Sequence, residues 1–303
     1  MTGSLIEVKD FRKIYGQVVA VDRISFDVRQ GEIFGLLGPN GAGKTTTLEC
    51  LEGLRSPNGG TLRVAGLDPQ KDTRKLRNLL GVQLQSASLP ESITPVEAMK
   101  FFCAYHNVKP KFDLLDRLGL AEKRKAQFFE LSTGQQRRLT LALSIAHDPQ
   151  VLLLDEPTAG LDVATRVELH AMMSELKQSG TTIILATHDM AEAEQMSDRV
   201  AILLQGRIAR IGTPLEITAA GEGLTKISVR TQAGSLSSAQ LPATSQQTSR
   251  DEYQIYFSSD IGKTVMAIIN FIESKGDTLI DLRVERPSLE DRFLEITASG
   301  VTK

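Results

Sequence analysis

A glycine-rich loop that ends in lysine and threonine is the first group of residues in this sequence that could do chemistry. The pattern G-x-x-x-x-G-K-[ST] runs from Gly38 to Thr45, after an apolar run at residues 33–37 and before leucines at helical spacing. Glycines allow positive φ angles and let a phosphate approach the backbone N–H groups, to which the start of the helix adds its own. Lys44 would reach the β- and γ-phosphates, and the Thr45 hydroxyl would bind Mg²⁺. The loop therefore predicts a nucleotide-phosphate site.

Two adjacent carboxylates follow a second aliphatic run, at residues 151–154. Asp155 suits a carboxylate linked to Mg²⁺, and Glu156, which points elsewhere, is free to hold or deprotonate an attacking water. His188 ends another aliphatic run, at residues 181–187. The acidic pair could be a plain helix cap and the histidine could be structural, but the phosphate loop upstream favours the catalytic interpretation of all three.

These groups need a fold that brings the ends of several strands together. Short aliphatic runs that alternate with helical segments indicate buried parallel strands with ligand groups at their carboxyl ends. Alternating strands between residues 5 and 29 suit an antiparallel sheet beside this core, and residues 199–211 indicate a closing hairpin. We therefore predict an α/β fold: a P-loop core with a mixed sheet, an antiparallel β edge and a helical subdomain at about residues 86–148.

The predicted helical subdomain contains one well-marked helix start and one buried helix. Residues 94–97, Thr-Pro-Val-Glu, combine an N-cap, a proline at the first helical position and a capping-box acid. Phe101 and Tyr105 lie off the apolar stripe that follows, so they are either core or a partner contact. Residues 131–146 turn into a nearly all-round apolar helix, which predicts burial.

The composition changes after about Gly221. Residues 231–249 are rich in Ser, Thr, Gln and Ala, which predicts a loop or a mobile excursion rather than core. Strands near 227–229, 253–257 and 279–284 and a helix at 261–275 predict a small α+β appendage. We expect a nucleotide-binding domain at residues 1–220 and an accessory domain at residues 221–303.

Composition and charge limit the class of protein. The chain has 303 residues, of which 41% are hydrophobic and 24% charged, with a net charge of −2 that argues against a nucleic-acid partner. Two cysteines fit reduced thiols in the cytosol rather than a disulfide framework. No signal-peptide pattern and no apolar run of membrane-spanning length is present, so we expect any membrane role to come through a partner chain.

A further segment, Leu131-Ser132-Thr133-Gly134-Gln135, decides among the nucleotide-binding classes. It resembles LSGGQ, the signature of the ATP-binding cassette (ABC) family, with Thr133 in place of the first glycine. Serine and glycine at a helix start would present N–H groups and a hydroxyl to a phosphate. The resemblance covers about residues 5–215 and implies that this segment serves the ATP held by a second copy of the chain.

The resemblance also implies roles for single residues. Tyr15 resembles the aromatic residue on which adenine stacks, and Asp162 resembles the acid of the loop that contacts the opposite subunit. Gln85 resembles the glutamine that touches Mg²⁺ or the water, with Gln83 as its rival by spacing. With Gln85, the implied catalytic residues are Glu156 and His188. The implied metal site is Thr45, Gln85 and Asp155. The implied ATP contacts are Gly38, Pro39, Asn40, Gly41, Ala42, Gly43, Lys44, Thr45, Thr46 and, from the other copy, Ser132, Gly134 and Gln135.

The last helix carries a second resemblance. Residues 285–294, ERPSLEDRFL, are similar to the C-terminal tail of ATPase subunits of drug, antibiotic, polysaccharide or sodium exporters. The resemblance implies an Mg²⁺-dependent ATPase that forms a homodimer and energises a separate permease from the cytoplasmic face of the membrane. The rivals are a soluble ABC ATPase of translation or DNA repair, a P-loop kinase or GTPase, and a cassette that does not hydrolyse ATP. Intact Lys44, Asp155 and Glu156 disfavour the last of these.

Overall fold

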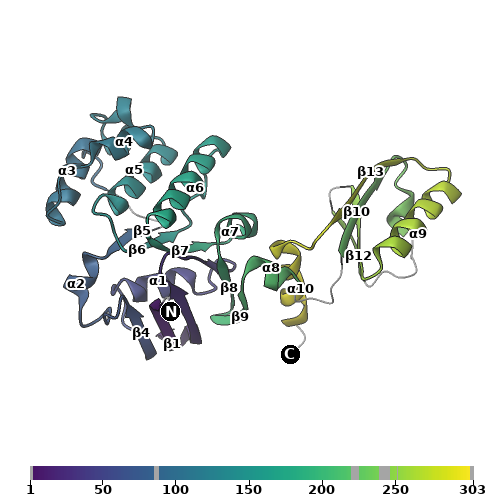
Figure 1. The fold of residues 1–303 in the computed structure, drawn as a ribbon, viewed down its shortest axis with the longest axis horizontal. Coiled ribbons are helices and arrows are strands. Elements are labelled where there is room, and N and C mark those ends of the chain that lie inside the picture. Colours follow the sequence, from purple (N-terminus) through teal and green to yellow (C-terminus); the bar gives the residue numbers. More distant parts are fainter. Residues whose placement is uncertain (1–2, 85–88, 220–224, 239–245, 251, 301–303) are drawn as a thin grey trace. The chain divides into compact units, whose positions relative to one another are not determined.

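The structure is a computed structural model that describes residues 3–84, 89–219, 225–238, 246–250 and 252–300. The chain divides into two compact units, residues 1–213 and 214–303 (Figure 1). The expected boundary at residues 220–221 therefore falls a few residues inside the second unit. Helix α8 (Pro214–Ala219) belongs to that unit, where the carbonyl of Thr218 accepts a hydrogen bond of 2.9 Å from Arg292 Nε.

A six-stranded sheet forms the centre of the first unit. Its strands, in spatial order, are β5 (Leu80–Gln83), β6 (Val151–Asp155), β7 (Thr182–Thr187), β3 (Ile33–Leu37), β8 (Arg199–Leu204) and β9 (Arg207–Gly212). The first five strands are parallel, and β9 returns antiparallel to β8. Every residue of β3, β6 and β7 is buried, because both faces of a parallel sheet are covered. The carboxyl ends of these strands carry the predicted site.

Alternate residues of each central strand enter two different cores. Leu152 and Leu154 of β6 pack into a helical core on one face, and Val151 and Leu153 pack into a second core on the other face. The helical core is built from α3 (Pro95–Tyr105), α4 (Phe112–Arg117), α5 (Thr133–Ile145) and α6 (Val163–Gln178), which lie on the same side of the sheet in Figure 1. The short helices η1 (Ala121–Lys123) and η2 (Phe128–Glu130) connect α4 to α5.

The second core lies between the central sheet and an antiparallel sheet of order β2-β1-β4. These strands are β1 (Ser4–Tyr15), β2 (Val18–Arg29) and β4 (Gly59–Val64), and helix α1 (Lys44–Leu51) packs into the same core. Phe26 of β2 stacks on Phe34 of β3 with ring centroids 5.1 Å apart. The expected α/β fold with a mixed central sheet and an antiparallel edge is confirmed.

Two further helices belong to the described part of the first unit, and a capping box marks the start of α3. Helix α2 (Thr73–Arg77) precedes β5, and α7 (Met190–Met196) follows β7. The Thr94 hydroxyl accepts a hydrogen bond from Glu97 N, and the Glu97 carboxylate accepts one from Thr94 N, so the predicted capping box forms at α3. No helix in the described residues is long and apolar enough to cross a membrane.

The second unit contains a four-stranded antiparallel sheet of order β11-β12-β10-β13. Its strands are β10 (Thr225–Thr231), β11 (Gln246–Arg250), β12 (Tyr253–Ser258) and β13 (Leu279–Glu285), accompanied by α9 (Ile261–Ser274) and α10 (Leu289–Gly300). The polar stretch at residues 231–249, expected to be a loop, contains the short helix η3 (Ser235–Ser238) and β11. Leu236 of η3 is buried in the core with Ile268 and Ile272 of α9, so part of this polar stretch contributes to the core of the second unit.

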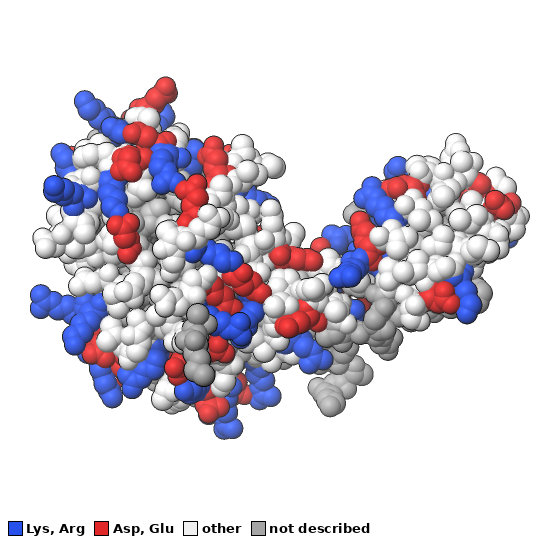
Figure 2. Space-filling model, in the orientation of Figure 1, with Lys and Arg blue, Asp and Glu red and all other residues white. Residues whose placement is uncertain are grey.

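Charges of both signs are interspersed on the face of the molecule that Figure 2 shows. Lys and Arg lie next to Asp and Glu over both units, and neither sign gathers into a broad patch on that face.

Candidate active site

The phosphate loop joins β3 to α1 and depends on glycines at defined positions. Gly38, Gly41 and Gly43 all have positive φ angles, of 155°, 81° and 106°. A Cβ at Gly38 would lie 2.4 Å from the carbonyl oxygen of Leu203, and one at Gly43 would lie 2.8 Å from that of Ala20. A Cβ at Gly41 would meet nothing within 4 Å. The first and third glycines therefore allow close packing of the loop against neighbouring strands, and the second leaves open space.

Lys44 begins helix α1 and its ammonium is held within the loop. Its Nζ donates to the carbonyls of Gly38 at 2.7 Å and Pro39 at 3.3 Å, and lies 3.4 Å from Glu156 Oε1. The side chain is only 5% exposed, so it is a buried cation that faces the end of β6. This position suits contact with the outer phosphates of a nucleotide.

The next residue, Thr45, contacts the first of the two carboxylates. Thr45 Oγ1 donates a hydrogen bond of 2.7 Å to Asp155 Oδ2, and the other oxygen, Asp155 Oδ1, is buried without a hydrogen-bond partner among the described residues. Burial raises the pKa of Asp155 above its usual value, and the hydrogen bond from Thr45 offsets part of this rise. A hydroxyl beside a carboxylate with an unused oxygen is the donor set that Mg²⁺ prefers, so these residues fit that ion.

Glu156 lies directly after β6 with its carboxylate between two other functional groups. Glu156 Oε2 is 2.7 Å from His188 Nδ1, and Oε1 is 3.4 Å from Lys44 Nζ. The residue is 4% exposed and has a left-handed backbone, with φ of 52°. The two adjacent carboxylates therefore have different partners: Asp155 contacts Thr45, whereas Glu156 contacts Lys44 and His188.

A cavity of about 350 Å³ lies between these groups. It is lined by Tyr15, Ala20, Pro39, Asn40, Gly41, Gly43, Lys44, Thr45, Thr46, Asp155 and Glu156. Tyr15 lies at the end of β1, is 38% exposed, and has the Lys13 ammonium 4.9 Å from its ring centroid. Ala20 of β2 was not predicted, because nothing in the local sequence marks a small residue of an antiparallel strand as a neighbour of the loop.

The signature segment lies apart from this cavity. Ser132 is the N-cap of α5, where its hydroxyl accepts a hydrogen bond from Gln135 N at 3.3 Å and its N–H donates to Gln135 Oε1 at 3.0 Å. Asp162 caps α6 in a similar way, and its hydrogen bonds from the backbone and hydroxyl of Thr165 lower its pKa. Ser132, Gly134, Gln135 and Asp162 are not among the residues that line the cavity.

Gln85, the predicted glutamine of the site, lies outside the described residues. Gln83, its rival, is buried at the end of β5, and its Nε2 donates to the carbonyl of Arg137 at 3.3 Å and to Thr140 Oγ1 at 3.4 Å. Its side chain thus points into α5, and it does not line the nucleotide cavity.

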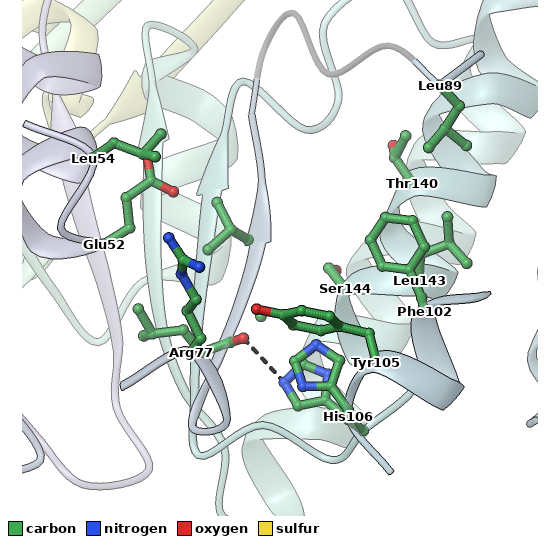
Figure 3. A pocket seen from close by; sticks show the side chains of 14 residues that line it. Glu52, Leu54, Arg77, Leu89, Phe102, Tyr105, His106, Thr140, Leu143 and Ser144 are labelled. Carbon is green, nitrogen blue, oxygen red and sulfur yellow. Dashed lines mark hydrogen bonds between the residues drawn. The ribbon is translucent and has the colours of Figure 1, made fainter. Parts of the chain in front are cut away.

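A second cavity, of about 300 Å³, lies elsewhere in the first unit (Figure 3). Glu52, Leu54 and Arg77 form one wall, and residues of α3 and α5, with the rings of Phe102 and Tyr105 among them, form the other. Burial raises the pKa of Glu52 to about 7. We refer to this cavity as the aromatic groove.

The comparisons with known proteins agree with the geometry. Residues 21–159 match the family model described as ABC transporter. The chain is 30% identical to the linearmycin resistance ATP-binding protein LnrL of Bacillus subtilis over 97% of this chain and 98% of that protein. It is 32% identical to the daunorubicin resistance ATP-binding protein DrrA3 of Streptomyces coeruleorubidus, over 98% and 97% of the two chains. The Nod factor export ATP-binding protein I of Ralstonia nicotianae is 40% identical over 70% of this chain and 68% of that protein.

Solved structures show the same fold in the larger unit. An ATP-binding subunit of an ABC transporter superposes with a TM-score of 0.67 and 27% identity over 71% of this chain and 92% of that one. A dimeric cassette bound to ADP and phosphate gives a TM-score of 0.64 with 23% identity, over 69% and 98% of the two chains. The fold and the site define a P-loop ATPase. The chain belongs to the ABC transporter family, as an ATP-binding subunit that hydrolyses ATP, and the resemblance found in the sequence is confirmed.

Proposed function

We propose that the chain is the ATPase subunit of an exporter, acting on a separate membrane permease that holds it at the cytoplasmic face. Two relatives that match it over nearly its whole length, LnrL and DrrA3, are named for resistance to linearmycin and daunorubicin. Because the match with LnrL covers 97% of this chain, it extends into the exporter-like tail at residues 285–294. The observation that carries the proposal is the grouping of Lys44, Asp155 and Glu156 around one cavity.

In the proposed reaction, Glu156 acts as the general base. Its Oε1 has no hydrogen-bond partner among the described residues and is ion-paired only with Lys44, so it would accept the proton from water once a phosphate takes over part of the Lys44 charge, while His188 holds Oε2 at 2.7 Å. Lys44 lies 3.4 Å from the same carboxylate, where a γ-phosphate oxygen could replace part of that contact. Thr45 and Asp155 would hold Mg²⁺, which when bound would neutralise phosphate charge. Tyr15 on the cavity wall would stack on the adenine.

The second half of each site would come from another copy of the chain. Ser132, which is exposed, and Gly134, which is half-buried, lie at the start of α5, a place that suits a phosphate, but they do not line the cavity of their own chain. Two copies arranged head to tail would place each Ser132 segment, with Gln135 and Asp162 beside it, over the other copy's phosphate loop. A homodimer with two equal sites is the simplest closed arrangement.

The aromatic groove is the proposed docking site for the permease. Tyr105 is 58% exposed and projects into the groove, and Phe102 lies beside it on the same helix. A groove with an aromatic wall and a few polar groups suits an amphipathic helical segment of a partner. Tyr105→Asp should abolish co-purification with the permease yet leave the ATPase rate of the isolated chain unchanged. Phe129→Asp, at an exposed aromatic outside the groove, should change neither co-purification nor the ATPase rate.

The hydrolytic assignment has its own test. Glu156→Gln should keep ATP binding and lose about 10²-fold or more in turnover, because positioned acid–base catalysis contributes about 10²–10⁴-fold. Turnover at the parent rate in this variant would show that Glu156 is not the base.

A further inference from the structure

We propose that Arg137 is a positioning residue for Glu156. The inference rests on the proposed function, in which Glu156 is the general base. Arg137 lies in the second turn of α5, five residues after Ser132, and its Nη1 donates a hydrogen bond of 2.6 Å to the backbone carbonyl of Glu156. Nothing in the family signature itself points to this contact, since it links a helix to a strand end 19 residues further along the chain.

The carbonyl that Arg137 contacts is one of the two backbone polar groups that flank the Cα of the catalytic side chain. Glu156 has a φ of 52°, a conformation that a non-glycine residue keeps only when its surroundings hold it. On one side, Glu156 N donates to the carbonyl of Ala186 in β7 at 2.8 Å. On the other, the Glu156 carbonyl accepts hydrogen bonds from Arg137 and, at 3.3 Å, from Ala159 N. The strand and the helix together therefore hold the backbone of Glu156.

The charge of Arg137 is directed at this carbonyl rather than at an acid. Within the described parts of the chain, no carboxylate lies within 4 Å of its guanidinium, whereas the next residue, Arg138, has Glu168 at 3.7 Å. A hydrogen bond from a charged donor is stronger than one between neutral groups. The two neighbouring arginines of α5 therefore have different partners: Arg138 pairs with a carboxylate, and Arg137 contacts the carbonyl of Glu156.

The same helix turn is tied to β5. The Arg137 carbonyl accepts a hydrogen bond of 3.3 Å from Gln83 Nε2, and Gln83 is buried in the strand that leads toward Gln85. Helix α5 also begins at Ser132, which would contact the nucleotide of the other copy. A shift of α5 would therefore act on the Glu156 peptide through Arg137, and the proposed catalytic carboxylate would respond to the position of the signature helix.

The test compares Arg137→Gln and Arg137→Lys with a matched control, Arg138→Gln, in the full chain. We expect Arg137→Gln to lower kcat for ATP about 10- to 100-fold, because a small misplacement of a catalytic group has effects of that order, with KM changed less than about threefold. Arg137→Lys keeps a cationic donor and should recover part of kcat, and Arg138→Gln should change kcat less than about threefold. Binding of a non-hydrolysable ATP analogue and the Tm of each variant separate a catalytic effect from unfolding.

A double variant tests whether Arg137 acts through Glu156. In the Glu156→Gln background, Arg137→Gln should lower the residual rate by less than about twofold, because residues that act as a unit are not additive. A parent-like kcat for Arg137→Gln, an equal loss in analogue binding, or a full additional loss in the double variant would each overturn the inference. If Glu156→Gln itself turned over normally, the proposed function would fail first, so the two failures are distinguishable.

Discussion

His188 Nδ1 lies 2.7 Å from Glu156 Oε2, although 32 residues separate them in the sequence. The histidine directly follows β7 and the carboxylate directly follows β6, and these strands are parallel neighbours in the sheet. His188 is 56% exposed whereas Glu156 is 5% exposed at the side chain, so the contact connects a buried carboxylate to the surface. In the proposed mechanism, this contact holds Oε2 and leaves Oε1 for the water.

Loss of this contact should slow hydrolysis more than it weakens binding. We expect His188→Gln to lower kcat about 10²-fold, because the base loses the group that orients it, while the affinity for ATP changes little. Steady-state ATPase assays and equilibrium binding of an ATP analogue check this. His106→Gln, at a histidine of the aromatic groove, is the control. If His188→Gln and His106→Gln had the same kcat, His188 would not have the proposed role in orienting Glu156.

The proposed sharing of each site between two copies predicts complementation. Lys44→Ala damages the phosphate loop, and Gly134→Asp would place a negative charge at the signature; a Cβ there would meet only Leu161 Cδ2, at 3.5 Å, an ordinary contact. Each variant alone should be inactive. An equal mixture should regain about a quarter of the parent rate, because about half of the dimers are mixed and each holds one intact site.

The mixture is measured against each variant at the same total protein concentration. If the signature served the phosphate loop of its own chain, every chain in the mixture would still be defective. Absence of recovery, in a mixture shown to exchange subunits, would therefore contradict the shared site.

Substitution of a closely packed glycine of the phosphate loop, such as Gly43, should destabilise the protein more than substitution of Gly41, which faces open space. Gly43→Ala adds a Cβ 2.8 Å from the Ala20 carbonyl oxygen at a φ of 106°, whereas Gly41→Ala adds one in open space at a φ of 81°. Both changes cost about 1–3 kcal/mol in backbone strain, but only the first adds a steric conflict. We expect the larger loss of unfolding free energy for Gly43→Ala in urea titrations without nucleotide. Equal losses would mean that the contact with Ala20 relaxes freely.

The buried carboxyl of Glu52 should make stability depend on pH. Its ordinary pKa is 4.5 and burial raises it to about 7 in the folded protein. Between these values the folded state binds more protons than the unfolded state, so the free energy of unfolding falls as the pH rises through this window. Glu52→Gln removes the effect. Because one pKa unit corresponds to about 1.4 kcal/mol, the variant should gain about 3 kcal/mol of stability relative to the parent between pH 4 and pH 8.

The comparison uses urea titrations of both proteins across this pH range, with Glu91→Gln, at an exposed carboxyl, as the control. Because other titrating groups, such as His147 in the same groove, are common to both proteins, the difference between them isolates Glu52. A difference that does not change with pH would show that folding leaves the pKa of this carboxyl at its ordinary value.

Much of the fold could be predicted because its determinants are local. The aliphatic runs that become β3, β6 and β7 are buried along their whole length, and the Thr94–Glu97 capping box forms as its four residues indicate. The glycine pattern likewise marks the phosphate loop, because positive φ angles are a property of the residues themselves.

Other features depend on partners that are distant in the chain, and only the tertiary structure decided them. Gly43 is constrained by Ala20 of β2, and the peptide of Glu156 by Arg137 of α5. Arg292 of the second unit donates a hydrogen bond to α8, and the first unit ends at residue 213 in the structure rather than at the expected residue 220. By itself the sequence determined which chemical groups this ATPase carries and at which strand ends they lie. The directions in which these groups point were decided by hydrogen bonds and packing between segments far apart in sequence, which no local pattern specifies.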